Sequence, residues 1–74
     1  MNSVIVWSKD ACTFCEQAKS LLKSRNIPFE ERRVGDGWTR EDFFAAVPNA
    51  RTFPQIVIND DVIGGFTELK AMLP

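Results

Sequence analysis

Residues 4–15 read VIVWSKDACTFC, and this stretch decides how the rest of the chain is arranged. Its first four residues are β-branched or aromatic, which predicts a buried strand. A polar loop over residues 8–11 then leads to a Cys-x-x-Cys pair, Cys12 and Cys15. We expect this pair at the start of a helix, where two residues three apart face the same side and come close enough for a disulfide.

The residues that follow Cys12 predict a helix from Thr13 to about Arg25. Its N-terminal cap is either Cys12 itself or Thr13 in a capping box with Glu16. The proline in the segment 26–28 ends the helix, because proline cannot continue it. The predicted apolar face contains Phe14, Ala18, Leu21 and Leu22. The predicted polar face contains Glu16, Gln17, Lys19, Lys23 and Ser24.

Downstream, a polar run over Phe29–Val34 predicts an edge strand, and Thr39–Val47 predicts a helix capped by Thr39. The apolar face of that helix contains Phe43, Phe44 and Val47. Residues 55–63 predict a hairpin with its turn at 59–61, and the glycine pair at 64–65 ends its second strand. A last helix is expected over Phe66–Leu73.

The order βαβ followed by ββα predicts one four-stranded mixed sheet with the first strand in the centre and three helices on its faces. This is the α/β architecture of the thioredoxin fold. A length of 74 residues predicts a single domain over residues 1–74.

Composition excludes several classes of function. Nine basic and ten acidic residues give a net charge of −1, so nothing favours nucleic acid or an anionic membrane as a partner. No apolar run approaches the roughly 20 residues of a membrane span, and the start lacks the pattern of a signal peptide. We therefore expect a cytoplasmic monomer, in a compartment where most thiols are kept reduced.

The two cysteines have no histidine to assist them. A structural zinc site normally takes four ligands, and a Cys–His dyad is excluded. A helix N-terminus carries about half a positive charge and free N–H groups, which favours a thiolate at Cys12, and Lys9 adds to this field. Cys15 lies one turn further in and is the expected resolving thiol. The motif alone also leaves open an inert cysteine pair or half of an intermolecular zinc site.

Three motifs resemble one known family, the dithiol glutaredoxins of the thioredoxin superfamily. CTFC at 12–15 resembles their active-site motif, usually Cys-Pro-Tyr-Cys. ARTFPQIVI at 50–58 resembles their Thr-Val-Pro-Gln segment, and GGFTEL at 64–69 resembles the turn before their last helix. The resemblance implies a glutathione-dependent oxidoreductase that reduces protein disulfides and glutathione mixed disulfides, with ribonucleotide reductase as a natural electron acceptor.

The resemblance also implies a glutathione site. Pro54 should follow a cis peptide bond beside the cysteines, and the Phe53 backbone should pair with the cysteinyl part of glutathione. Within this site the resemblance implies that Lys9 and Arg51 hold the glycine carboxylate of glutathione. It implies that the N–H groups of Gly65, Phe66 and Thr67 hold the γ-glutamyl carboxylate. It also implies that Phe14 packs beside the sulfur and that Thr52 belongs to the binding segment.

Several of these residues also have a simpler interpretation. A lysine in a polar loop, such as Lys9, is also typical of a solvated surface charge. Arg51 could instead pair with surface carboxylates, and Phe66 could instead pack the last helix against the core. The aromatic residue Trp38 matches no catalytic position and is interpreted as loop packing.

Departures from the family pattern leave alternatives open. Thr13 replaces the usual proline, which removes a rigid first helical position and favours the reduced form. Phe14 lacks the tyrosine hydroxyl, and Thr67 stands where many members have Asp. We expect glutathione as co-substrate and no resident metal. The alternatives are a dimer that bridges a [2Fe–2S] cluster through Cys12 of each chain and two glutathiones, and a redoxin driven by thioredoxin reductase.

Overall fold

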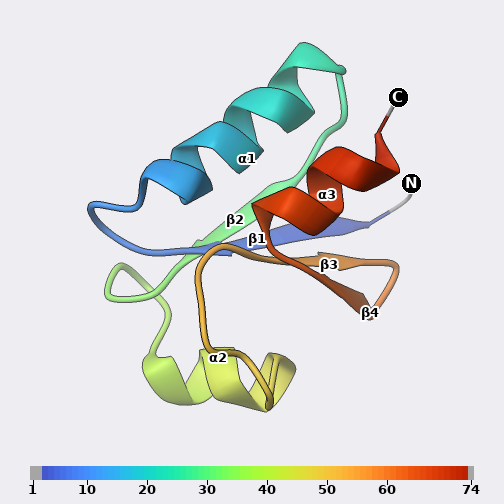
Figure 1. The fold of residues 1–74 in the computed structure, drawn as a ribbon. Coiled ribbons are helices and arrows are strands. Elements are labelled where there is room, and N and C mark those ends of the chain that lie inside the picture. The colour runs from blue at the N-terminus through green and yellow to red at the C-terminus, as the bar shows by residue number, and fades with distance from the viewer. Residues whose placement is uncertain (1–2, 74) are drawn as a thin grey trace.

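The computed structural model describes residues 3–73, which form a mixed sheet with helices on both faces (Figure 1). In chain order the elements are β1 (Val4–Ser8), α1 (Thr13–Ser24), β2 (Glu30–Arg33), α2 (Arg40–Ala46), β3 (Gln55–Ile58), β4 (Asp61–Gly64) and α3 (Phe66–Met72). The strand order is β2-β1-β3-β4, with β1 parallel to β2 and antiparallel to β3. The predicted thioredoxin architecture is confirmed, with β1 inside the sheet and β2 at its edge. Residues 1–2 and 74 of the predicted domain lie outside the described residues.

The two faces of the sheet carry different cores. Helices α1 and α3 cover one face and α2 covers the other (Figure 1). Because side chains alternate along a strand, Val4 and Val6 of β1 face α1 and α3, whereas Trp7 faces α2. The aliphatic core contains Val4, Val6, Ala18, Leu22, Ile56, Ile58 and Leu69. The aromatic core contains Trp7, Phe43, Val47 and Val57, with Trp38 and Phe53 packed against it.

Helix α1 is rotated relative to the sequence prediction. Its buried residues are Cys15, Ala18, Lys19 and Leu22. Lys19 was predicted on the polar face and is instead 9% exposed, while Phe14 of the predicted apolar face is 57% exposed. The buried stripe therefore begins at Cys15, and it tolerates Lys19 because two carboxylates meet the ammonium group.

The helix caps correct a second prediction. Cys12 is the N-cap of α1, and its sulfur accepts the Cys15 N–H at 3.2 Å, so the alternative cap at Thr13 is wrong. Thr39 caps α2 as predicted, in a reciprocal capping box with Asp42. Phe44 of this short helix is 39% exposed rather than part of the core, because only the i, i+4 pair Phe43 and Val47 points at the sheet.

The β3–β4 hairpin has a shorter turn than predicted. Asn59 and Asp60 form the two-residue turn with φ of 50° and 69°, and Asp61 already belongs to β4. Two consecutive positive φ values match the twist of paired strands, which favours this turn over a three-residue one. None of the helices within residues 3–73 is long and apolar enough to cross a membrane.

Candidate functional site

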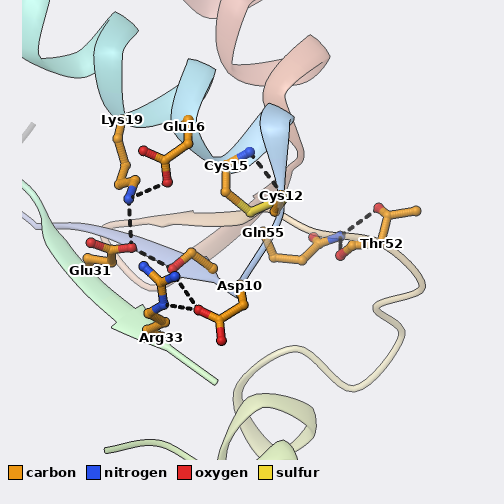
Figure 2. Close-up of a disulfide and its surroundings, with 10 residues drawn as sticks. Asp10, Cys12, Cys15, Glu16, Lys19, Glu31, Arg33, Thr52 and Gln55 are labelled. Atoms are coloured by element: carbon orange, nitrogen blue, oxygen red, sulfur yellow. Dashed lines mark hydrogen bonds and ion pairs between the residues drawn. A yellow bond between two sulfur atoms is a disulfide. The ribbon is translucent and has the colours of Figure 1, made fainter. Parts of the chain in front are cut away.

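The Cys12–Cys15 disulfide lies at the N-terminus of α1, just beyond the end of β1 (Figure 2). The Cα atoms of the two cysteines are 5.2 Å apart. Cys12 is half-buried, whereas Cys15 is 0% exposed. A substrate can therefore reach the Cys12 sulfur first, which is the order of access that an attacking and a resolving cysteine require.

The local backbone gives Cys12 its electrostatic setting. As the N-cap residue it has extended geometry, and its sulfur lies where the cap side chain meets the free N–H groups of the first helical turn. When the disulfide is reduced, the Cys15 N–H that now donates to this sulfur faces a thiolate, which is a stronger acceptor. The positive end of the α1 dipole acts in the same direction.

The loop before β3 presents its backbone beside the disulfide. The Phe53–Pro54 peptide bond is cis, as the resemblance implies, and Pro54 is fully buried. The Gln55 side-chain amide donates to the Thr52 carbonyl oxygen at 2.9 Å, which holds the loop against β3 (Figure 2). The Phe53 ring stacks on Phe43 with ring centroids 4.4 Å apart. The loop is thus held by a hydrogen bond at Thr52 and by ring stacking at Phe53.

A groove of about 240 Å³ runs between this loop and the start of α3. Phe14 and Phe66 lie on its wall with their rings stacked, 6.1 Å between centroids. The groove brings together most of the predicted glutathione residues: Phe14, Thr52, Phe53, Pro54, Gly65, Phe66 and Thr67. Glu68 completes its lining, whereas the predicted Lys9 and Arg51 lie outside it.

The glycine pair at the end of β4 lies beside the cis-proline loop, and Gly65 lines the groove. Gly64 has φ +117°, and a Cβ there would lie 2.8 Å from the Glu68 side chain. A Cβ at Gly65 would lie 3.3 Å from the Pro54 carbonyl oxygen. The Gly65 N–H, predicted to bind glutathione, donates to the Glu68 carboxylate at 2.7 Å. The chain itself therefore occupies one of the three predicted amide donors.

A second and larger pocket of about 710 Å³ opens on the other side of Phe53. Its lining comprises Lys9, Asp10, Val34, Gly35, Gly37, Trp38, Thr39, Arg40 and Phe53. The Lys9 ammonium lies over the Phe53 ring, 5.5 Å from its centroid. Trp38 packs on Trp7, with ring centroids 5.4 Å apart, as its interpretation as a packing residue implies. It also lines this pocket, which that interpretation did not predict. The adjacent glycines at 35 and 37 were the only signal of open space.

A polar network lies near the disulfide, on the inner side of α1 (Figure 2). Ser8 and Lys19 both donate to one carboxylate oxygen of Glu31, at 2.6 and 2.9 Å. The Ser8 hydrogen bond lowers the pKa of Glu31, with help from Lys19 and against the effect of burial. Hydrogen bonds from Lys19 to Glu16 and Glu31 raise the pKa of Lys19. The sequence prediction missed this network, whose one signal is that Lys19 lies four residues after Cys15.

A separate ion pair joins the two chain segments that flank the larger pocket. Arg33 at the end of β2 pairs with Asp10 in the loop before Cys12 (Figure 2). The hydrogen bond that the Arg33 guanidinium donates to the Asp10 carboxylate raises the pKa of Arg33. This ion pair fixes the β1–α1 loop relative to β2, and the positive charge of Arg33 balances the negative charge of the Asp10 carboxylate.

Comparison with known proteins agrees with this geometry. The family model described as Glutaredoxin matches residues 4–63. The chain is 37% identical over 70 residues to a probable glutaredoxin of Synechocystis sp., covering 93% of this chain and 77% of that protein. The crystal structure of glutaredoxin 1 from Francisella tularensis complexed with cacodylate is similar with a TM-score of 0.79 and 36% identity, over 93% of this chain and 88% of that one.

A more distant structure shows the same fold. The buckwheat glutaredoxin–glutathione complex matches with a TM-score of 0.78 at 19% identity, over 92% of this chain and 64% of that one. With the cysteine pair at the helix start, these findings identify a thiol–disulfide oxidoreductase. The chain belongs to the glutaredoxin family.

Proposed function

We propose that this oxidoreductase uses glutathione as its reductant and reduces both glutathione mixed disulfides and protein disulfides. The observation that carries the proposal is the groove, in which residues from three separate segments meet: Phe14 from the first turn of the helix that Cys12 caps, the 52–54 loop, and the 65–67 turn. The solved glutathione complex of the buckwheat relative supports glutathione as the ligand.

The reaction is thiol–disulfide exchange. The Cys12 thiolate attacks the glutathionyl sulfur of a mixed disulfide, the old S–S bond breaks, and the protein thiolate leaves and takes a proton from solvent. A second glutathione thiolate then attacks the glutathionyl sulfur on Cys12, which releases oxidised glutathione and restores the Cys12 thiolate. With a protein disulfide, the Cys12 thiolate first forms a mixed disulfide with one substrate sulfur and releases the other as a thiolate. The Cys15 thiolate then attacks the Cys12 sulfur, the bond to the substrate breaks, the second substrate thiolate leaves, and the Cys12–Cys15 bond seen here forms. Two glutathione thiolates in succession reduce this bond and leave as oxidised glutathione.

Two cations outside the groove are available to a carboxylate of glutathione: Lys9, which lies over the Phe53 ring, and Arg51, which precedes Thr52 in the chain. Within residues 3–73, neither Lys9 nor Arg51 has a carboxylate within 4.0 Å. These two cations are proposed to attract the glycine carboxylate, and the Phe66 and Thr67 N–H groups to bind the γ-glutamyl carboxylate. The Gly65 N–H can contribute only when Glu68 moves away from it. The cytosolic location, the monomeric state and ribonucleotide reductase as electron acceptor belong to the same proposal.

The test is glutathione-dependent reduction of bis(2-hydroxyethyl) disulfide, coupled to NADPH and glutathione reductase. We expect turnover by the wild type and by Cys15→Ser, and none by Cys12→Ser, because only Cys12 forms the mixed disulfide with glutathione. Wild type that is inactive here but is reduced by thioredoxin reductase would show that the reductant is wrong. Visible absorbance after anaerobic purification, with no turnover, would favour the cluster-bridging dimer.

A further inference from the structure

We propose that the larger pocket beside Phe53 binds a protein substrate. The pocket takes up one large apolar side chain of the substrate, which lies close in sequence to the reacting cysteine and next to an acidic residue. The proposal rests on the proposed function, because it names the protein-substrate site of the same Cys12. We call this cavity the aromatic pocket and define it by Lys9, Val34, Trp38, Arg40 and Phe53.

The size and lining of the aromatic pocket distinguish it from the groove. Its volume is about 710 Å³, against about 240 Å³ for the groove. Two aromatic rings and Val34 supply apolar surface, and a Cβ at Gly35 or Gly37 would meet nothing within 4 Å, so the pocket is open there. Glutathione has no large apolar side chain, whereas a protein segment does. Burial of such a side chain is the gain that this pocket offers.

The aromatic walls are already held in place. Trp38 lies edge-on to the buried ring of Trp7, and Phe53 stacks on the buried ring of Phe43. The Arg32 guanidinium covers the Trp38 ring at 4.4 Å from its centroid. A pocket with fixed walls needs little reordering when it binds a ligand, which favours affinity.

The rim of the aromatic pocket is positively charged. Among residues 3–73 no carboxylate lies within 4.0 Å of the Lys9 or Arg40 charge. The one acidic residue of the lining, Asp10, is paired with Arg33. Among the lining residues, a carboxylate next to the apolar side chain of the substrate therefore meets two cations without a carboxylate partner, and the one lining anion is already paired. This favours acidic over basic substrate segments.

The pocket is also placed for access to the reacting sulfur. Phe53 forms a wall of both the groove and the aromatic pocket, and Lys9, which touches its ring, is three residues before Cys12. A substrate whose cysteine is bonded to Cys12 can extend past Phe53 into the pocket.

The experiment measures a single reaction that needs no glutathione. Three synthetic peptides carry one cysteine activated as its thionitrobenzoate disulfide, flanked by Phe and Asp, by Ala and Asp, or by Phe and Lys. The Cys12 thiolate of the reduced Cys15→Ser variant attacks the peptide sulfur, the S–S bond breaks, and coloured thionitrobenzoate leaves as the thiolate. The mixed disulfide of thionitrobenzoate with 2-mercaptoethanol serves as the control without side chains.

We expect the Phe–Asp peptide to react at least about tenfold faster than the Ala–Asp peptide at limiting concentration, which is the scale of burying one large side chain. Adding Trp38→Ala should abolish this preference and leave the control reaction unchanged. Trp38→Phe should retain most of it, which separates a lost contact from a damaged fold. Arg40→Gln should reduce only the preference of Asp over Lys. The control variant Met72→Ala changes an exposed apolar side chain outside the pocket and should alter nothing.

Equal rates for the Phe–Asp and Ala–Asp peptides would overturn the proposal. So would a Trp38→Ala variant that slows the control as much as the peptides, because the pocket would then serve the chemistry of Cys12 in general. Loss of glutathione turnover in the coupled assay, with the peptide preference intact, would contradict the proposed reductant and leave this pocket standing.

Discussion

The two faces of the sheet perform different tasks. The aliphatic core under α1 and α3 fixes the helix that carries both cysteines, and its buried members are all aliphatic side chains. The aromatic core under α2 is built from large rings, and Phe53 and Trp38 at its margin line an open pocket. The comparison teaches that the face covered by α1 and α3 sets the position of the Cys12 sulfur, while the face covered by α2 supplies the surface proposed to bind the protein substrate.

The strongest way to break this comparison is to remove one large side chain from each core. Phe43→Ala should cost about 3–5 kcal/mol and Leu22→Ala about 2–5 kcal/mol in the free energy of unfolding, a large part of the stability of so small a domain. Urea denaturation followed by circular dichroism measures both values. Phe43→Ala should in addition weaken substrate binding, because Phe53 stacks on this ring.

Activity per folded molecule is the control for these two variants. Leu22→Ala should retain the wild-type KM once the unfolded fraction is subtracted, since this side chain lines neither the groove nor the pocket. An equal rise in KM for both variants would mean that the two faces do not divide the tasks.

The next effect concerns the polar network at the margin of the aliphatic core. Glu31→Gln should destabilise the protein by about 1–3 kcal/mol at pH 7, because buried Lys19 loses a charged partner. The folded-state pKa of Glu31 lies below its ordinary value, so its contribution is present above that ordinary value and is lost as pH falls through the folded pKa. Unfolding measured from pH 7 to pH 3 should show the wild-type and Glu31→Gln stabilities converge. A constant difference at all pH values would show that ionisation of Glu31 does not matter.

Two glycines provide a smaller and sharper contrast. Gly64 and Gly37 both have positive φ, of +117° and +90°, so alanine should cost about 1–2 kcal/mol at either position. Only at Gly64 does the new Cβ also displace Glu68, beside the groove. We expect Gly64→Ala to change the KM for the glutathione mixed disulfide and Gly37→Ala to leave it unchanged. Steady-state kinetics at matched folded fractions decides this, and identical KM values would contradict it.

The smallest effect belongs to the start of α2. Thr39→Ala removes one half of the capping box and should cost about 1 kcal/mol. Thr67→Ala is the matched control at the start of α3, where Glu68 rather than a threonine caps the helix. Its stability should stay within about 0.5 kcal/mol of wild type. A larger loss at Thr67 than at Thr39 would contradict this assignment of caps.

Much of the fold could be predicted because its signals are local. The apolar run of β1, the proline after α1 and the glycine pair before α3 act within a few residues of their positions, and each element was found within about two residues of its bounds. The cysteine motif and the segment around Pro54 resemble those of glutaredoxins, and this resemblance, rather than any local pattern, is why the groove residues could be named in advance.

The errors fall where contacts between distant segments decide the outcome. Lys19 is buried because Glu31 of β2 accepts a hydrogen bond from its ammonium group, and no periodicity within α1 shows this. Phe14 and Phe44 are exposed because packing against the sheet sets the rotation of their helices. The aromatic pocket needs Lys9, Trp38 and Phe53 from three loops, so its existence depends on the assembled fold.

The most direct test of the central claim is mass spectrometry of the two single-cysteine variants after incubation with oxidised glutathione. The account predicts that Cys15→Ser, which retains the accessible Cys12, gains the mass of one glutathione and loses it again on addition of reduced glutathione. Cys12→Ser, which retains only the fully buried Cys15, should gain none under the same conditions. A glutathione adduct on Cys15, or no adduct on Cys12, would contradict the assignment of Cys12 as the nucleophile that forms the mixed disulfide with glutathione.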